Sequence, residues 1–283
     1  MNSKASSASI IEYEVRENIA IVSINRPERA NAQNDDITYG LDAAFKRACY
    51  DNDVQVIVLR STGKHFSAGH DIGVRNDAEV LPEQRATLWY DYRDSVGAER
   101  QYVREHEVFL GMCRRWREIP KPMIAAVPGA CIAGGLMLAW VCDLIIAADD
   151  AFFADPVVSM GVPGVEYSAH AFEMSPRIAR EFLMLGERMS AQRAYEVGMV
   201  NRVAPRERLD DEAFAMAKRL AERPRFALAL TKQALNMVDD IRGKKSAIDA
   251  MFALHHVGQA HNQMLTGQVS LNRDVEKMKK ALD

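Results

Sequence analysis

The sequence predicts an α/β fold in which strands alternate with helices, followed by a helical C-terminal region. Residues 19–24 and 54–59 are apolar runs of strand length. Between them, Asn34 precedes a stretch with apolar residues at helical spacing, which is typical of a capped amphipathic helix. A strand, a helix and a strand of these lengths predict a right-handed parallel crossover. From residue 206 onward the pattern is almost wholly helical.

Length and charge favour one sizeable core in a protein without a nucleic-acid partner. The chain has 283 residues, 48% of them hydrophobic, and a formal net charge of −3. This length suits a core formed by residues 1–205 and a helical appendage formed by residues 206–283. A near-neutral charge offers no electrostatic footprint for nucleic acid.

The N-terminus and the cysteines indicate a cytoplasmic protein. Residues 1–9 are small and polar, without the apolar run of a signal peptide or membrane anchor, so no membrane partner is expected. The cysteines are far apart and lack zinc-binding spacing, so they are expected to be reduced core thiols and no metal is expected: Cys49, Cys113, Cys131 and Cys142.

Further elements follow from local signals along the chain. Residues 10–15 and 19–24 predict a β-hairpin, and residues 144–147 and 152–154 predict short strands. Residues 156–164 are loop-like because they contain two glycines and two prolines. Helices are expected to begin at Ser175-Pro176 and at Ser190, and the C-terminal helices to break near Pro224 and Gly243.

The stretch from Lys121 to Ala148 carries the first candidate site. A buried strand over residues 123–127 is followed by a Pro-Gly turn and then by Gly134-Gly135, which open a short apolar helix ending before Asp143. Backbone N–H groups at a helix start lack partners within the helix and suit an oxygen that gains negative charge. The alternative is a close-packed turn without chemistry.

A second loop has the same character. The strand at residues 56–59 runs into the segment from Gly63 to Ile72, where small residues precede Asp71, an acidic residue suited to begin a helix. Each of the two strand-to-loop junctions therefore offers one backbone N–H group to a common site.

These segments, taken in order, resemble the enoyl-CoA hydratase/isomerase (crotonase) superfamily. The resemblance rests on five segments: Ile24–Ala32, Phe66–Ile72, Lys121–Ala148, Ala154-Asp155-Pro156 and Leu185–Arg202. It implies a crotonase-like ββα superhelical core and a helical C-terminal region that covers the acyl-CoA site. It also implies a homotrimer or homohexamer, with coenzyme A entering as part of the substrate and no separate cofactor.

The resemblance assigns roles to individual positions. The N–H groups that hold the thioester carbonyl correspond to His70 and Gly134, and the imidazole of His70 either joins the chemistry or points to solvent. Arg29, Ala30 and Ala68 match contacts to the coenzyme A part of the substrate, although Arg29 also suits an ordinary surface position. Substrate contacts are expected at Asp71 and Ile72 as well.

Two departures from the family pattern affect the chemistry. Typical hydratases place one glutamate a turn after the second oxyanion glycine and another just after a later proline. This chain has Met137 and Val157 at those positions, which we assign to the substrate pocket. Neither side chain carries a proton, so the usual acid/base pair is missing.

Nearby acidic residues are the candidates to replace this pair. Glu166 lies in the loop that follows the position of the second glutamate and is ranked ahead of Asp155, which precedes Pro156. Each has an ordinary alternative, a solvated Glu and a turn-forming Asp. His170 and Tyr167 are lesser candidates.

The charged stretch over residues 74–118 is either a solvated helix pair or a lid over the acyl end of the pocket. Its later part, residues 98–117, has a helical pattern. Only the lid interpretation would bring Tyr90, Tyr92 and Glu99 near the substrate.

The sequence therefore indicates an acyl-CoA-binding enzyme that stabilises a thioester enolate, with hydration, dehydration or double-bond isomerisation as its reaction. The alternative is a non-catalytic acyl-CoA-binding protein, which the apolar Met137 and Val157 favour. A purely structural role is disfavoured because packing alone does not call for two glycine-containing donor loops.

Overall fold

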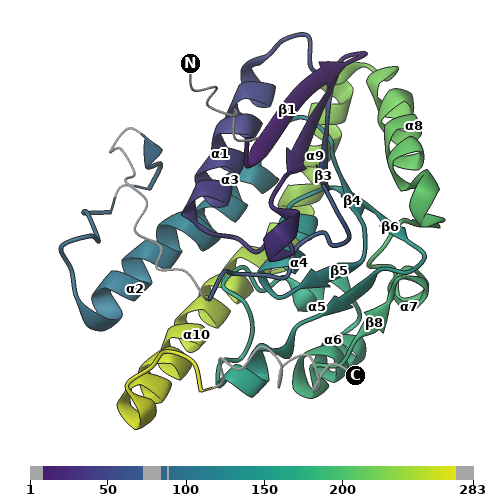
Figure 1. Cartoon of the computed structure of the whole chain (residues 1–283). Coiled ribbons are helices and arrows are strands. Elements are labelled where there is room, and N and C mark those ends of the chain that lie inside the picture. Colours follow the sequence, from purple (N-terminus) through teal and green to yellow (C-terminus); the bar gives the residue numbers. More distant parts are fainter. Residues whose placement is uncertain (1–8, 73–83, 88, 272–283) are drawn as a thin grey trace, which may run out of the picture.

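The computed structural model describes residues 9–72, 84–87 and 89–271 and confirms an α/β fold (Figure 1). The larger sheet has the strand order β1-β2-β3-β4-β6-β9, in which β1 is antiparallel to β2 and the other neighbours are parallel. Its strands are β1 (Ile11–Arg16), β2 (Ile19–Ile24), β3 (Val56–Ser61), β4 (Met123–Val127), β6 (Leu144–Ala148) and β9 (Arg202–Ala204). The hairpin and the parallel crossover are both confirmed.

A smaller sheet lies beside the larger one and follows the order β5-β7-β8. Its strands are β5 (Ala130–Ile132), β7 (Phe152–Ala154) and β8 (Met189–Ser190). Strands β5, β8 and β9 have two or three residues each, too short to produce a recognisable hydrophobic pattern in the sequence.

Helices cover the larger sheet on both sides (Figure 1). Helix α1 (Asp35–Tyr50) packs on β1 and β2, and α8 (Leu209–Ala221) packs on β3, β4 and β6. The side chain of Asn34 accepts a hydrogen bond from the Ile37 amide, so the predicted cap of α1 is confirmed. Because both faces are covered, β2 and β4 are buried along their whole length, which explains their unbroken apolar runs.

The helix expected over residues 98–117 forms with a π-helical turn in its middle. It consists of α2 (Gly97–Glu105), the π-helical segment η3 (His106–Gly111) and α3 (Met112–Arg117). Such π-helical turns are frequent at functional sites because they change the direction in which side chains project. Residues 74–83 and 88 of the charged stretch lie outside the described residues, as does the helix expected to begin at Asp71 beyond residue 72.

The remaining helices begin and end close to the predicted signals, except for α5, a single turn that was not predicted. They are α4 (Gly134–Trp140), α5 (His170–Glu173), α6 (Pro176–Leu185), α7 (Ala191–Glu196), α9 (Arg225–Ile241) and α10 (Lys244–Thr266), with single turns η1 (Pro27–Arg29), η4 (Pro156–Met160) and η5 (Arg206–Arg208). The loop predicted over residues 156–164 thus begins as a 3-10 turn. Helix α10 packs against α9 and against α2, so the C-terminal region lies directly on the middle helix (Figure 1).

All four cysteines are free thiols in the structure, and Cys113 and Cys131 are buried. Within the described part of the chain, no helix combines the length and the apolar character needed to cross a bilayer.

Candidate active site

Two loops that leave neighbouring parallel strands come together at the candidate site. The Ser67 amide donates to the Ala130 carbonyl (3.1 Å), and the Ile132 amide donates to the Ser67 carbonyl (3.0 Å). This pairing joins the segment after β3 to β5, immediately before α4 begins. The two donor positions named from the sequence, His70 and Gly134, therefore lie next to each other.

Glycines make this close approach of the loops feasible. A Cβ atom at Gly69 would lie 3.0 Å from the Ile132 carbonyl oxygen and 3.3 Å from the Gly134 nitrogen, and φ at Gly69 is +93°. A Cβ atom at Gly135 would lie 2.7 Å from the Ser67 carbonyl oxygen. Ala133 is held at φ 47° and ψ −112°, a rare conformation for a residue with a side chain. The backbone is thus fixed in an unusual course just before Gly134.

The backbone N–H groups of His70 and Gly134 are the candidate donors. The parallel bridge between Gln33 and His70 uses the carbonyl of Gly69 and the amide of Asp71, and leaves the His70 amide out. Among the described residues, neither the His70 amide nor the Gly134 amide donates a hydrogen bond. Two unpaired amides side by side can hold one oxygen that carries negative charge.

The imidazole of His70 lies inside the site, so the solvent-facing alternative is wrong. The ring stacks on Phe109 of η3, with centroids 3.8 Å apart and 13° between the planes. A Cβ atom at Gly134 would lie 2.6 Å from the Cδ2 and Nε2 atoms of this ring. Burial lowers the pKa of His70 to about 4. The imidazole is therefore neutral at pH 7.

Glu166 is buried next to His70 rather than solvated. Its Oε1 atom lies 3.7 Å from His70 Nδ1 and 3.6 Å from His255 Nε2. Its Oε2 atom is buried and has no hydrogen-bond partner in the described chain. Burial raises the pKa of Glu166, and the nearby His255 opposes that shift. A raised pKa makes it easier for this carboxyl group to hold and exchange a proton.

Sequence reasoning missed Glu105, which projects from α2 into the same cluster and is only 3% exposed. Its carboxylate accepts hydrogen bonds from the side-chain amides of Gln101 and Gln259. Burial raises its pKa, and the negative charge of Glu166 adds to the shift. Nothing in the local sequence distinguishes this Glu from the other charged residues of the middle stretch.

His255 and His256 of α10 complete the cluster and were also missed. The Nε2 atoms of His255 and His256 lie 3.7 and 3.4 Å from Glu105 Oε2. The Nδ1 atom of His255 lies 2.6 Å from the Gly164 carbonyl oxygen, which can only accept, so Nδ1 carries a proton. The sequence held a signal for them, because His255, His256 and Gln259 follow Phe252 at helical spacing and would share its side of the helix. The structure buries Phe252, so this side of α10 faces the interior.

The same groups define the place where a cation would bind. Ligand atoms of Glu105, Glu166 and His255 lie within 4.8 Å of one another. The amide nitrogen of Gln259, however, lies 2.9 Å from His255 Nε2 and 3.1 and 3.2 Å from the two Glu105 oxygens. Hydrogen bonds through Gln259 therefore already join Glu105 to His255 in the described structure.

Asp155 forms a buried contact with His170 at the edge of the cluster, close enough for its charge to act on His70 and Glu166. Its Oδ2 atom is 2.9 Å from His170 Nε2, and His170 Nδ1 is 2.9 Å from the Ser168 hydroxyl. Both side chains are almost fully buried, and Trp140 packs edge-on against the His170 ring. Asp155 and His170 are thus neighbours, although the contact lacks hydrogen-bond geometry, and among the described residues neither forms an ion pair with Glu166 or His70.

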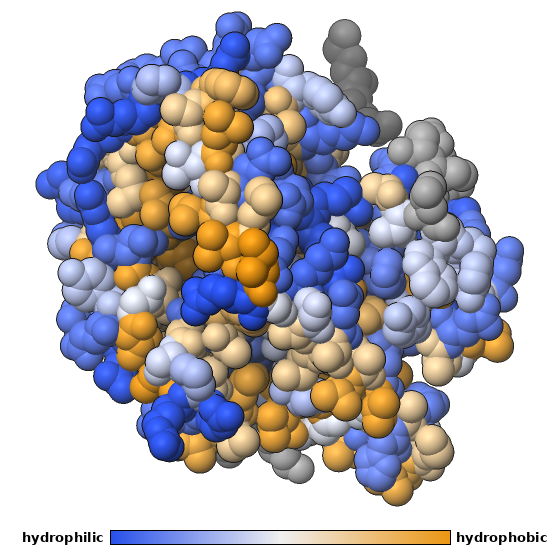
Figure 2. Space-filling view, turned by 180° about the vertical axis from the view of Figure 1, so that it is seen from behind, coloured by the Kyte–Doolittle hydropathy of each residue, from blue (hydrophilic) through white to orange (hydrophobic). Residues whose placement is uncertain are grey.

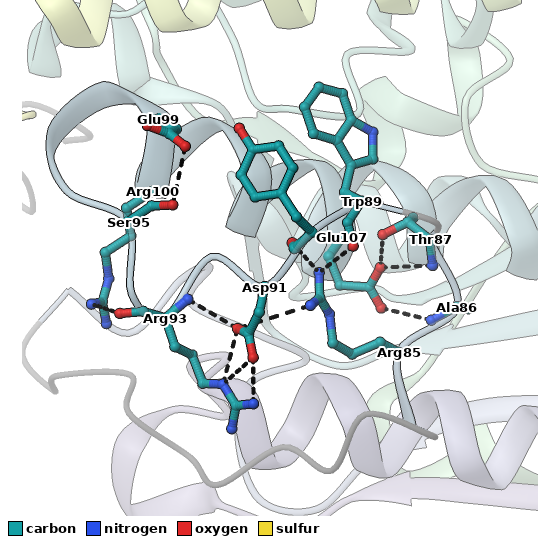
Figure 3. Close-up of polar contacts among 11 residues, drawn as sticks. Arg85, Ala86, Thr87, Trp89, Asp91, Arg93, Ser95, Glu99, Arg100 and Glu107 are labelled. Carbon is teal, nitrogen blue, oxygen red and sulfur yellow. Dashed lines mark hydrogen bonds and ion pairs between the residues drawn. The ribbon is translucent and has the colours of Figure 1, made fainter.

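The three residues singled out in the middle stretch, Tyr90, Tyr92 and Glu99, form no hydrogen bond or ion pair with Glu166, Glu105 or His255 among the described residues. Tyr90 is 54% exposed, Tyr92 is buried beside the Arg85 guanidinium, and Glu99 accepts a hydrogen bond from Ser95 (Figure 3). The helical stretch from α2 to α3 supplies Glu105 and Phe109 to the site instead, and the choice between a lid and a solvated helix pair stays a prediction. Tyr167 is buried elsewhere, beside Arg117 and Lys244.

The positions assigned to the substrate lie around the donor loops. Met137 on α4 and Val157 on η4 are buried. The Ala68 amide donates to the Ala30 carbonyl (3.0 Å), which joins two predicted contact segments. Asp71 is buried and forms an ion pair with Arg26 (2.7 Å), so its carboxylate orders the loop, whereas Arg29 and Ile72 are exposed at the surface.

The chain is similar to known proteins over most of its length. The family profile described as enoyl-CoA hydratase/isomerase matches residues 14–281. The crystal structure of a probable enoyl-CoA hydratase from Mycobacterium thermoresistibile is 47% identical, covers 92% of this chain and 99% of that chain, and has a TM-score of 0.84. A probable enoyl-CoA hydratase from Mycobacterium smegmatis is 42% identical, with 93% and 99% covered and the same TM-score. The 1,2-epoxyphenylacetyl-CoA isomerase of Escherichia coli K12 is 33% identical over 80% of this chain and 81% of that protein.

Proposed function

Because this chain belongs to the enoyl-CoA hydratase/isomerase family, we propose that it binds an acyl-CoA thioester and stabilises the enolate form of that thioester. The thioester carbonyl oxygen is placed between the N–H groups of His70 and Gly134. The adjacency of these two unpaired amides is the observation that carries the proposal. Backbone donors of this kind are fixed before the reaction, so they stabilise developing charge without reorganisation.

Glu166 is the acid/base in this proposal and is ranked ahead of Asp155. It lies beside the ring of His70, whose amide is one of the two donors, whereas Asp155 faces His170. A carboxyl group at this place moves a proton at a carbon next to the thioester, as required for hydration, dehydration or double-bond isomerisation. Hydratases and an isomerase are both found among the similar proteins.

Binding without catalysis is the second candidate function. It is favoured by Met137 and Val157, which are buried and carry no proton at the positions where typical hydratases have glutamates. The backbone donors do not depend on those side chains. Both candidate functions therefore require the same thioester site and differ only in turnover.

We further propose that Arg29, Ala30, Ala68 and Ile72 lie near the coenzyme A part of the substrate.

We also propose that the protein is a homotrimer or homohexamer located in the cytoplasm. The face turned away from the view of Figure 1 carries a broad apolar area (Figure 2). Helix α9 exposes large apolar side chains, a feature that favours burial against another subunit: Phe226, Leu230, Leu235, Met237, Val238 and Ile241.

Binding of an enolisable ester is the first test. Acetoacetyl-CoA is expected to bind, and coenzyme A alone to bind more weakly, because only the ester offers an oxygen to the two amides. Isothermal titration calorimetry measures both affinities. The site assignment is wrong if the ester shows no binding at millimolar concentration.

Hydration of crotonyl-CoA is expected to be very slow. General acid–base catalysis contributes about 10²–10⁴-fold, and the usual pair of glutamates is absent at Met137 and Val157. The loss of absorbance of the conjugated thioester measures the rate. Rapid hydration would show that other groups replace the usual pair fully.

A further inference from the structure

We infer that Glu105 and Glu166, held together by His255, exchange protons as one unit, so that Glu105 is a positioning residue that sets the protonation of Glu166. The inference rests on the proposed function for its catalytic meaning. The coupling between the two carboxyl groups can be tested without any substrate, so it stands or falls separately from the proposed function.

The geometry brings the two carboxyl groups to one imidazole nitrogen. His255 Nε2 lies 3.6 Å from Glu166 Oε1 and 3.7 Å from Glu105 Oε2. Because Nδ1 of this ring donates to the Gly164 carbonyl, Nε2 is the atom that faces the carboxyl groups. The side-chain amide of Gln259 lies 2.9 Å from the same Nε2 atom and also donates to Glu105, so it links the imidazole to that carboxyl group. A proton on either carboxyl group removes the repulsion between the two carboxylates, so a change of protonation at one affects the other.

The hydrogen bonds around the pair are asymmetric. Glu105 accepts from the Gln101 and Gln259 amides, whereas Glu166 Oε2 is buried without a partner. Donated hydrogen bonds favour the ionised form of Glu105. A like charge nearby makes ionisation of Glu166 less favourable, so loss of the Glu105 charge is expected to let Glu166 release its proton at lower pH.

Other ionisable groups also face the pair. They come from five parts of the chain, namely His70 in the donor loop, Arg104 on α2, Cys113 on α3, Asp155 before η4, and His255 and His256 on α10. Burial lowers the pKa of His255, but the charges of Glu166 and Glu105 outweigh burial, so that its pKa is raised. His255 in turn favours the ionised form of Glu166. The charge of Glu166 raises the pKa of Glu105, and the same repulsion acts in return on Glu166. Glu105 and His255 are therefore expected to act on Glu166 in opposite directions.

This opposition defines the experiment. Infrared difference spectroscopy of the full chain without substrate follows the carboxylic-acid band as pH is changed, and the part of the band lost in Glu166→Gln belongs to Glu166. The quantity compared is the pH at which the Glu166 part of the band has lost half of its intensity. Glu105→Gln is expected to shift this midpoint to lower pH, and His255→Gln to shift it to higher pH. Where turnover is measurable, the midpoint of the kcat profile should shift in the same two directions.

Glu107→Gln is the matched control. Glu107 is a buried carboxylate two residues from Glu105 on the same helical stretch, but it binds the Ala86 and Thr87 amides at 3.0 and 2.9 Å (Figure 3). Its removal is expected to leave the Glu166 midpoint unchanged. An equal shift in this control would mean that loss of any buried carboxylate acts through the fold, and would overturn the inference.

Two further results would also overturn it. One is an unchanged Glu166 midpoint in both Glu105→Gln and His255→Gln; if only one of these variants folds, its shift decides alone. The other is stoichiometric binding of Zn²⁺ to the parent chain with loss of the carboxylic-acid band, which would assign a metal site instead. Because the band is followed without substrate, absence of turnover leaves this test intact and counts against the proposed function only.

Discussion

Replacing Gly134 with proline is expected to lower turnover by about 10²–10³-fold, the effect of removing one donor from an oxyanion site. Proline has no N–H group, so the thioester oxygen would keep only the His70 amide. Gly134 is the first residue of α4, a position that proline occupies readily in helices. The helix start itself accepts proline, but the added ring crowds the His70 imidazole and restricts the backbone of Ala133, so the single variant loses turnover through bulk as well as through the missing N–H group. Turnover is measured on whichever acyl-CoA ester proves active.

A matched pair of variants separates the lost donor from added bulk. A Cβ atom at this position would lie 2.6 Å from the His70 ring, so both variants carry His70→Ala, which retains the His70 amide. His70→Ala/Gly134→Ala keeps the second N–H group, and His70→Ala/Gly134→Pro removes it. Equal turnover by the two double variants, with equal ester affinity, would place the oxyanion site elsewhere.

The donor loops were predictable because their chemistry depends on local backbone geometry. Gly69 and Gly135 are needed where two loops approach within van der Waals contact, and glycine is visible in a sequence. The buried strands β2 and β4 were predictable for a related reason, since strands covered on both faces read as unbroken apolar runs.

The buried cluster of Glu105, Glu166 and His255 was only half predictable because its members are far apart in the chain. Glu166 was found through its place after a known segment. Glu105 and His255 meet it only because α10 packs on α2, a contact between segments about 150 residues apart that no local pattern specifies. Asp155 was a fair candidate by position, but the fold supplies His170 as its partner instead.

Glu166→Gln is expected to reduce turnover by about 10²–10⁴-fold, the usual contribution of one general acid–base group, while acetoacetyl-CoA affinity is retained. Glutamine keeps the size of the side chain and removes its titratable proton. The thioester oxygen is held by the His70 and Gly134 amides in this proposal, so binding does not require the carboxyl group. The measurements are kcat on the active ester and calorimetric affinity for acetoacetyl-CoA.

Asp155→Asn is the comparison that decides whether Glu166 or Asp155 transfers the proton. It removes the charge that faces His170 at 2.9 Å, so it is expected to lower the free energy of unfolding, while the folded variant keeps more turnover than Glu166→Gln. Parent-like turnover in Glu166→Gln together with an inactive but folded Asp155→Asn would transfer the role to Asp155. If both variants turned over like the parent, the proton would come from another group, and the neutral imidazole of His70, stacked on Phe109 beside Gly134, is the next one in reach.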